Sequence, residues 1–245
     1  MPIYEAHRGQ VAYGFSVGIL CLEYHLPFIP GDVANASSYD FPVMFKEVPG
    51  ASGDAVIVKQ DAELTSNFIE AARWLVQQGC KAITSDCGYI GQYQDAVAEA
   101  LEVPVFLSSL LQVPMVTRML GPKRRLGIMV ANGASVSDRF LDKVGITDRS
   151  RVYFQGLEQQ PYFRKSILEE SGSLDSDAVE AEVVETALDM QREKPETGAI
   201  LMECSDLPPY SAAVQRATGL PVFDWIGFIN YVHHAVVRTP YQGIF

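Results

Sequence analysis

The chain has 245 residues, a length that allows one large domain or two small ones. Hydrophobic residues make up 48% and charged residues 20%, so the chain can bury a sizeable core and global disorder is excluded. The 30 Asp and Glu residues outnumber the 19 Lys and Arg residues, giving a net charge of −11 that opposes binding to nucleic acid or to anionic membranes.

Short β-branched runs alternate with amphipathic stretches along most of the chain. In the first half we predict strands at 15–22, 81–85 and 104–107 and helices at 61–79, 89–101 and 109–120. In the second half we predict strands at 125–130, 152–155, 199–202 and 222–223 and helices at 136–144, 161–169, 175–193 and 225–237. This alternation is typical of α/β proteins with parallel sheets covered on both faces. Residues 24–60 are rich in Pro, Gly and Asn and are interpreted as a lid or substrate-shaping loop with a second strand at 41–48.

The sequence also sets an expectation about the compartment. The longest aliphatic run, at about 17–22, falls far short of the roughly 18 apolar residues that a membrane helix needs. The first residues lack the basic and then apolar order of a signal peptide. We therefore expect a soluble cytoplasmic protein whose four cysteines are thiols.

An internal repeat relates the two halves at an offset of 117 residues. Residues 82–87 (AITSDC) fall on residues 199–204 (AILMEC), and ten of the 25 residues in 82–106 are identical to their partners without a gap. Cys87 thereby falls on Cys204. We predict two related α/β halves, each with a cysteine in the same place.

Each repeated cysteine follows a predicted strand and precedes a predicted helix, which starts near Gly88 in one half and at Pro208 in the other. Both thiols are then expected at the carboxyl ends of parallel strands, where open α/β sheets bind ligands. The positive end of a helix dipole should lower the pKa of each thiol toward neutrality. Pseudo-twofold packing would set Cys87 and Cys204 across a cleft, where one removes and the other returns a proton at a single carbon, as racemisation requires.

Other interpretations of the cysteines stay open. A buried cysteine is often a small apolar residue, and this is what we expect of Cys21 and Cys80. A redox pair is disfavoured because the chain has no C-x-x-C motif and the expected compartment is reducing. A non-enzymatic sensor of small carboxylates is a further alternative.

Three segments resemble the Asp/Glu/hydantoin racemase superfamily of cofactor-independent, two-cysteine enzymes. They are residues 87–89 (CGY), 108–114 (SSLLQVP) and 203–210 (ECSDLPPY). The resemblance runs from about residue 14 to residue 237, and is strongest to an uncharacterised branch that shares the loop 31–35 (GDVAN). It implies two pseudo-symmetric α/β/α lobes with mostly parallel sheets, an active site in the cleft between them, and frequently a homodimer.

The resemblance also implies an activity and a domain layout. Cys87 and Cys204 would be the two bases of a racemase or epimerase, an isomerase that acts on an amino acid or a related small carboxylate without cofactor or metal. Relatives with the same fold include arylmalonate decarboxylases and maleate cis–trans isomerases, so decarboxylation and cis–trans isomerisation are alternatives. We expect lobes at 1–115 and 116–221, with 222–245 packing back on the first.

Several further residues are candidates for binding the substrate. In the family, Asn-Thr usually follows the first cysteine and holds the substrate; here Gly88 and Tyr89 take those places, while Ser205 matches the hydroxyl after the second. The family's first strand usually ends in Asp-Ser near the substrate, which makes Glu23 a displaced candidate. The remaining candidates follow strands at predicted helix starts, where they cap the helix or bind a carboxylate: Ser108, Ser109, Asn132 and Ser135. Asp86 and Glu203 should point away from the side that each adjacent cysteine faces, in structural roles.

Overall fold

The computed structural model describes residues 3–244, which form two four-stranded parallel sheets. The first sheet has the order β2 (Val43–Glu47), β1 (Val17–Cys21), β3 (Ala82–Ser85), β4 (Val105–Phe106). The second has the order β6 (Val152–Gly156), β5 (Arg125–Val130), β7 (Thr197–Met202), β8 (Val222–Phe223). The two orders are equivalent, so the predicted duplication extends to the topology, and the predicted α/β fold of two lobes is confirmed.

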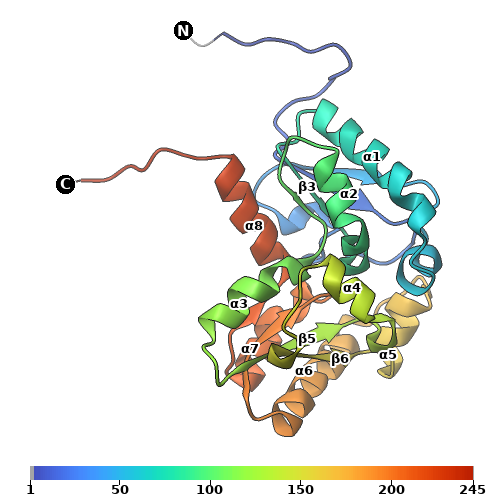
Figure 1. The fold of residues 1–245 in the computed structure, drawn as a ribbon, viewed down its shortest axis with the longest axis vertical. Coiled ribbons are helices and arrows are strands. Elements are labelled where there is room, and N and C mark those ends of the chain that lie inside the picture. The colour runs from blue at the N-terminus through green and yellow to red at the C-terminus, as the bar shows by residue number, and fades with distance from the viewer. Residues whose placement is uncertain (1–2, 245) are drawn as a thin grey trace.

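Helices connect the strands and cover the sheets, as Figure 1 shows with the first half above the second. Their bounds are α1 (Thr65–Gln77), α2 (Gln94–Glu99), α3 (Val113–Met119), α4 (Asp138–Lys143), α5 (Pro161–Phe163), α6 (Ser176–Glu193), α7 (Ser211–Thr218) and α8 (Trp225–Val236). Several begin with a 3-10 turn, such as Gly88–Tyr93 before α2 and Ser109–Gln112 before α3. The predicted helices therefore exist, but their first turns are tighter than α-helix.

Equivalent glycines let a long helix approach the inner strand of each sheet. A Cβ on Gly18 in β1 would lie 2.9 Å from Leu75 Cδ1 of α1, and one on Gly127 in β5 would lie 2.6 Å from Met190 Sδ of α6. These distances are too short for any side chain, so the two glycines maintain the same helix-to-sheet contact. The two glycines lie in similar strand sequences, residues 17–19 (VGI) in β1 and 126–128 (LGI) in β5, and this shared contact accounts for the similarity.

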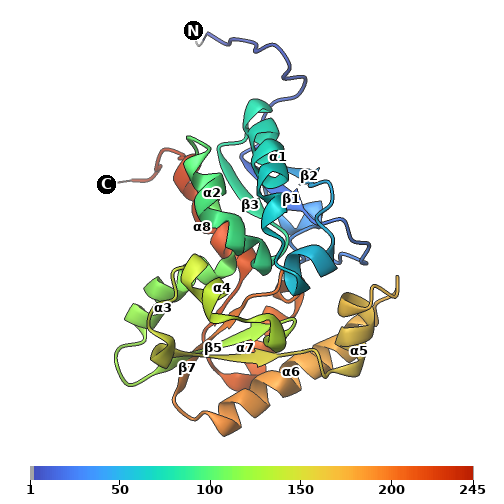
Figure 2. The same ribbon diagram turned by 45° about the vertical axis from the view of Figure 1, so that its right-hand side comes forward.

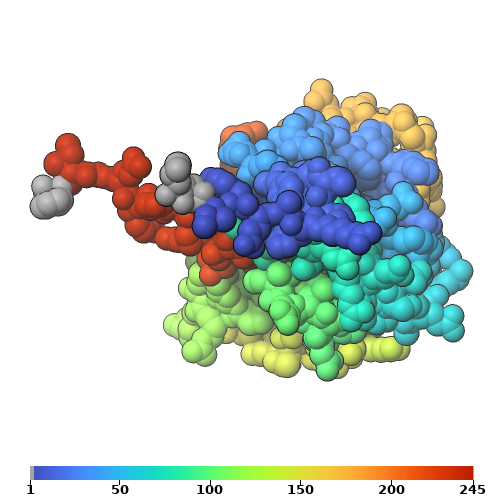
Figure 3. Space-filling model, turned by 90° about the horizontal axis from the view of Figure 1, so that it is seen from above, coloured from blue at the N-terminus to red at the C-terminus, as the bar shows by residue number. Residues whose placement is uncertain are grey.

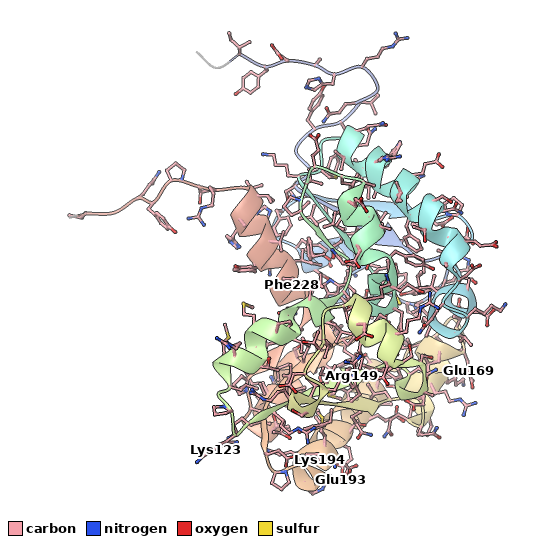
Figure 4. All side chains as sticks on the ribbon, viewed as in Figure 1. Lys123, Arg149, Glu169, Glu193, Lys194 and Phe228 are labelled. Carbon is pink, nitrogen blue, oxygen red and sulfur yellow. The ribbon has the colours of Figure 1, made fainter. Side chains whose placement is uncertain are left out.

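The last helix returns to the first sheet. Trp225 at the start of α8 is fully buried, and its indole N–H donates to the Thr84 hydroxyl of β3 at 3.2 Å. Phe228, labelled in Figure 4, packs edge-on against Phe106 of β4 with ring centroids 5.2 Å apart. Figure 2 shows α8 beside the first half from a second angle. Because β8 pairs with β7, the returning segment begins after residue 223, two residues later than predicted.

The long segment 24–60 holds more structure than a loop. Besides β2 it contains a single π-helical turn, Asp54–Val58, and a matching π-helical turn, Arg164–Leu168, occupies the corresponding place in the second half. Each turn is followed two residues later by a non-glycine residue with positive φ, Gln60 at 50° and Glu170 at 49°. The two segments are thus a pseudo-symmetric pair.

Both chain ends run outside the packed body. Figure 1 shows the N-terminal segment in blue rising away from the first half, and Figure 3 shows the residues after α8 in red extending beyond the body. Within residues 3–244 no helix is long and apolar enough to cross a bilayer.

Candidate active site

A cavity of about 360 Å³ lies where the two sheets meet, at the carboxyl ends of the inner strands. Its wall consists of the segments that follow β1, β3, β5 and β7, together with the two π-helical turns. The lining residues are Tyr24, Leu26, Gly53, Asp54, Ile57, Val58, Cys87, Gly88, Tyr89, Ala131, Asn132, Ile167, Leu168, Glu170, Glu203, Cys204, Ser205 and Asp206. Each half contributes strand ends to one shared space, which is the site that the strand pattern predicts.

The two repeat-related cysteines line this cavity in matching local geometry. Cys87 and Cys204 are each only 7% exposed. In both cases the backbone N–H two residues later, that of Tyr89 for Cys87 and of Asp206 for Cys204, acts to lower the pKa of the thiol. Both remain free thiols, as do Cys21 and Cys80. Symmetry therefore presents one thiol from each half to the same ligand space.

The predicted lowering of the thiol pKa values is wrong. Burial raises the pKa of Cys87 well above its ordinary value, and nearby Glu203 and Asp86 add to the rise. Burial also raises the pKa of Cys204, with Asp206 as the next cause. Cys204 is separated from the 3-10 turn at Pro208–Tyr210 by three residues, so no helix dipole bears directly on it. In the ligand-free site both groups are thiols at neutral pH.

Cys204 has a carboxyl partner, which the sequence prediction treated only as a family match. Its thiol donates to Asp206 Oδ2 at 3.3 Å. Asp206 in turn shares a side-chain hydrogen bond with Asp32, and burial raises the pKa of Asp32 so that Asp32 carries the shared proton. Ala34 N–H donates to Asp32 Oδ1 at 2.8 Å and fixes the pair. Asp206 is thereby held as an acceptor for the Cys204 proton.

Glu203 also lies in the cavity wall, contrary to the prediction from strand alternation. Strand β7 ends at Met202, so the alternation of side chains no longer applies at the next residue. Glu203 is 1% exposed, and neither of its carboxylate oxygens has a hydrogen-bond partner among residues 3–244. Burial, followed by the charge of Asp206, raises the pKa of Glu203 to about 8.

Gly88 makes room for this carboxylate. A Cβ at position 88 would lie 1.7 Å from Glu203 Oε1 and 2.4 Å from its Cδ. The glycine that replaces the family's usual asparagine is therefore matched to the glutamate on the opposite half. Asp86, the residue equivalent to Glu203 in the first half, has the predicted structural role, because its carboxylate accepts the hydrogen bond of the Leu22 N–H just after β1.

Other predicted binding residues fall both inside and outside the cavity. Tyr89 and Asn132 line it together, and the Tyr89 hydroxyl donates to the Asn132 carbonyl at 2.5 Å across the two halves. Ser108 caps its 3-10 turn through the Leu110 N–H, and Ser135 offers its carbonyl to Gln60. These two serines are absent from the lining.

The remaining candidates are occupied by structural hydrogen bonds. The Ser205 side chain belongs to the lining, but its hydroxyl donates to the Asp86 carbonyl rather than pointing at a substrate. Ser109, outside the lining, bonds to the carbonyls of Met202 and Glu203 at 3.3 Å. Glu23, also outside it, accepts the Gly50 N–H at 2.9 Å. Ser205 and Ser109 join the two halves behind the cysteines.

The lining is acidic and lacks cationic side chains. Asp54, Glu170, Glu203 and Asp206 border the cavity, and among residues 3–244 no Lys, Arg or His does. A ligand with two carboxylates would meet no opposite charge here. A ligand with one carboxylate and a compact cation suits the site better.

Comparison with known proteins identifies the family. The chain is 33% identical over 238 residues to dimethylsulfoniopropionate lyase 7 of Emiliania huxleyi, covering 94% of this chain and 69% of that protein. It is 32% identical over 235 residues to the dimethylsulfoniopropionate lyase of Durusdinium sp. clade D, covering 77% of that protein. The chain belongs to the dimethylsulfoniopropionate lyase family. It spans 62% of lyase 3 from Emiliania huxleyi, so that relative is considerably longer.

Solved structures show the same fold at low sequence identity. Unliganded arylmalonate decarboxylase aligns with TM-score 0.60 at 17% identity, over 92% of this chain and 94% of that chain. Allantoin racemase from Pseudomonas fluorescens also gives 0.60 at 17% identity, over 91% of both chains. Glutamate racemase from Bacillus anthracis gives 0.57 at 15% identity, over 90% of this chain and 82% of that chain. No family model matches the chain.

The solved structures show the fold that the resemblance to the Asp/Glu/hydantoin racemase superfamily predicts, and the relatives at 32–33% identity place the chain in the dimethylsulfoniopropionate lyase family. The chain is an enzyme with a racemase-type fold. The predicted isomerase class is not confirmed, because the curated relatives are lyases.

Proposed function

We propose that this enzyme is a cofactor-independent lyase that eliminates a leaving group from the β-carbon of a small carboxylate. Dimethylsulfoniopropionate is the substrate to test first. The observation that carries the proposal is the shared cavity, which combines two thiols with an acidic lining free of Lys, Arg and His among residues 3–244. This substrate has one carboxylate and one sulfonium cation, in agreement with that lining. Aspartate, glutamate, arylmalonates and maleate each bring a second carboxylate that would stay unpaired.

Cys204 is the proposed base. Asp206 accepts its thiol proton at 3.3 Å, which leaves a thiolate when the proton moves across. The thiolate removes a proton from C2, next to the carboxylate. The electrons of that C–H bond form the C2=C3 double bond, and the C3–S bond breaks with its electron pair remaining on sulfur. The products are dimethyl sulfide and acrylate, with Cys204 again a thiol and the first proton still on Asp206; release of that proton to solvent restores the starting state.

Cys87 gives the site a second possible reaction. Cys87 lines the same cavity, but among residues 3–244 it has no carboxyl hydrogen-bond partner equivalent to Asp206, and its raised pKa keeps it a thiol, which is the form of a proton donor. A proton donor on the other side of the substrate from the base would allow racemisation or epimerisation at the α-carbon, which is the reaction that the two-base prediction describes. Two matched thiols are the specific observation in favour of this second candidate.

One experiment separates the two candidates. Purified enzyme is incubated with dimethylsulfoniopropionate in D2O, dimethyl sulfide is measured in the headspace, and acrylate and deuterium at C2 are measured by NMR. Elimination predicts both products, a loss of about 10²–10⁴-fold in Cys204→Ser, and a smaller loss in Cys87→Ser.

The racemase candidate is tested with the same variants on chiral amino acids and 2-substituted carboxylates. It predicts exchange of the α-proton with solvent and comparable losses in both variants. Absence of dimethyl sulfide above the level of the double variant Cys87→Ser/Cys204→Ser would contradict the lyase proposal.

A further inference from the structure

We infer that Glu203 is the residue that recognises the cationic group of the substrate and makes the cavity selective for carboxylates that carry a compact, permanent cation. The inference rests on the proposed function for the identity of the substrate, but it concerns binding alone. It assigns the glutamate before the second cysteine a role in specificity, separate from that of the thiols.

The first argument is that the carboxylate of Glu203 has no partner. A carboxylate that leaves water costs free energy unless it is paired or hydrogen-bonded, yet both oxygens of Glu203 are buried without a partner among residues 3–244. Glu203 is a lining residue of the cavity, and its carboxylate lies directly against Gly88, another lining residue. A sulfonium or quaternary ammonium group lacks N–H and O–H donors, so it pairs with a carboxylate through charge alone. An unbonded carboxylate beside the cavity is suited to such a cation.

The second argument is that the opposite half is shaped around this carboxylate. The nearest approach comes from Gly88, where any Cβ would overlap Glu203 Oε1 at 1.7 Å. Gly88 has no positive φ, so its backbone does not require glycine. A side chain at position 88 would therefore displace the Glu203 carboxylate from its present place.

The third argument is the set of groups that face Glu203. They are Cys87 and Tyr89 from the first half and Cys204 and Asp206 from its own segment. None of these groups can carry a positive charge, and the Asp206 carboxylate already accepts a hydrogen bond from the Cys204 thiol. In the empty site the raised pKa keeps Glu203 largely protonated near neutral pH. A bound cation favours the ionised form, so binding releases this proton.

The test uses a pair of ligands with the same shape and different charge, and an assay for acrylate after each titration verifies that neither is cleaved. These are 3-(trimethylammonio)propionate, which is cationic at one end, and 4,4-dimethylpentanoate, its neutral isostere. Isothermal titration calorimetry gives the ratio of their affinities for each variant. An opposite charge within about 4–6 Å shifts a pKa by one to three units, which corresponds to a preference of about tenfold or more for the cation. Glu203→Gln should lower this preference by about tenfold and leave the affinity for 4,4-dimethylpentanoate within about threefold.

Two further variants complete the comparison. Gly88→Ala displaces the carboxylate without removing it and should also reduce the preference for the cation. Glu169→Gln is the matched control: it removes one charge from an exposed residue outside the lining, labelled in Figure 4, and should leave the preference unchanged. In the wild type the preference should rise between pH 6.5 and 9 as Glu203 ionises, and Glu203→Gln should show less of this rise.

The outcomes separate this inference from the proposed function. If Glu203→Gln weakens both ligands equally, or leaves the preference intact, Glu203 does not recognise the cation, even when dimethylsulfoniopropionate is cleaved. If the preference depends on Glu203 but no dimethyl sulfide forms, the recognition role stands and the lyase proposal fails. If the Glu203→Gln protein does not fold, the test relies on Gly88→Ala and on the pH series of the wild type. A preference for the cation that Gly88→Ala does not reduce and that does not change with pH overturns the inference.

Discussion

Replacing Glu203 with glutamine should change how the stability of the protein depends on pH. The pKa of Glu203 is about 8 in the folded chain, against an ordinary value of 4.5 that applies after unfolding. The folded state therefore holds this proton more tightly, so its contribution to stability is full below pH 4.5 and is lost as the pH rises through about 8. At ~1.4 kcal/mol for each pH unit, the loss is at most about 5 kcal/mol. Glutamine keeps the shape of the side chain and has no proton to lose.

The assay is urea unfolding of wild type and Glu203→Gln at pH 5, 6, 7 and 8. The other raised carboxyl pKa values, those of Asp32, Asp86 and Asp206, act in both proteins and largely cancel in the difference. We expect the variant to gain stability relative to wild type by roughly 1 kcal/mol for each pH unit over this range. At pH 5 the difference in the free energy of unfolding between the two proteins measures the separate cost of burying an unpaired amide, about 1–3 kcal/mol. Parallel curves for the two proteins would refute the argument that burial holds the Glu203 proton.

Three further changes have definite expected outcomes. Because burial raises the pKa of the Cys204 thiol, kcat/KM for the elimination should rise between pH 7 and 9. Asp206→Asn removes an adjacent negative charge, so it should move this rise to lower pH, and it should reduce the maximal rate because the thiol loses its proton acceptor. Gly18→Ala should lower the free energy of unfolding by about 1–3 kcal/mol through overlap with Leu75, and an unchanged urea midpoint would contradict the close contact of α1 and β1. Trp225→Phe should cost about 1–2 kcal/mol by removing the bond to Thr84, with kcat unaffected. Thr84→Val also removes the bond to the Phe106 carbonyl, so the double variant decides: losses that add without coupling would contradict a role for the Trp225–Thr84 bond.

The strand-and-helix pattern predicted the fold because the inner strands are continuous apolar runs and the repeat at an offset of 117 residues reports a duplicated sheet. The same repeat predicted that Cys87 and Cys204 face one shared site, and both line the cavity. Glu203 was misplaced because period-two alternation holds only while the chain remains a strand, and β7 ends one residue before it. The thiol pKa values were misjudged because burial acts more strongly than the local helix start, and carboxyl groups add to it: Asp206 beside Cys204, and Glu203 of the other half beside Cys87. Such groups, like the pairing of Asp32 with Asp206, depend on tertiary packing that no local pattern encodes.

The serine hydrogen bonds across the two halves have a consequence for how the enzyme can be inactivated. Ser205 binds the Asp86 carbonyl and Ser109 binds the carbonyls of Met202 and Glu203, each beside one of the two cysteines. The spacing between the thiols is therefore a property of the interface, not of either half. A small molecule or a substitution that wedges the halves apart at these serines would leave both sheets folded and every lining residue present. The enzyme would then lose its activity only because the distance between the two thiols, with the reacting carbon of the substrate between them, had increased.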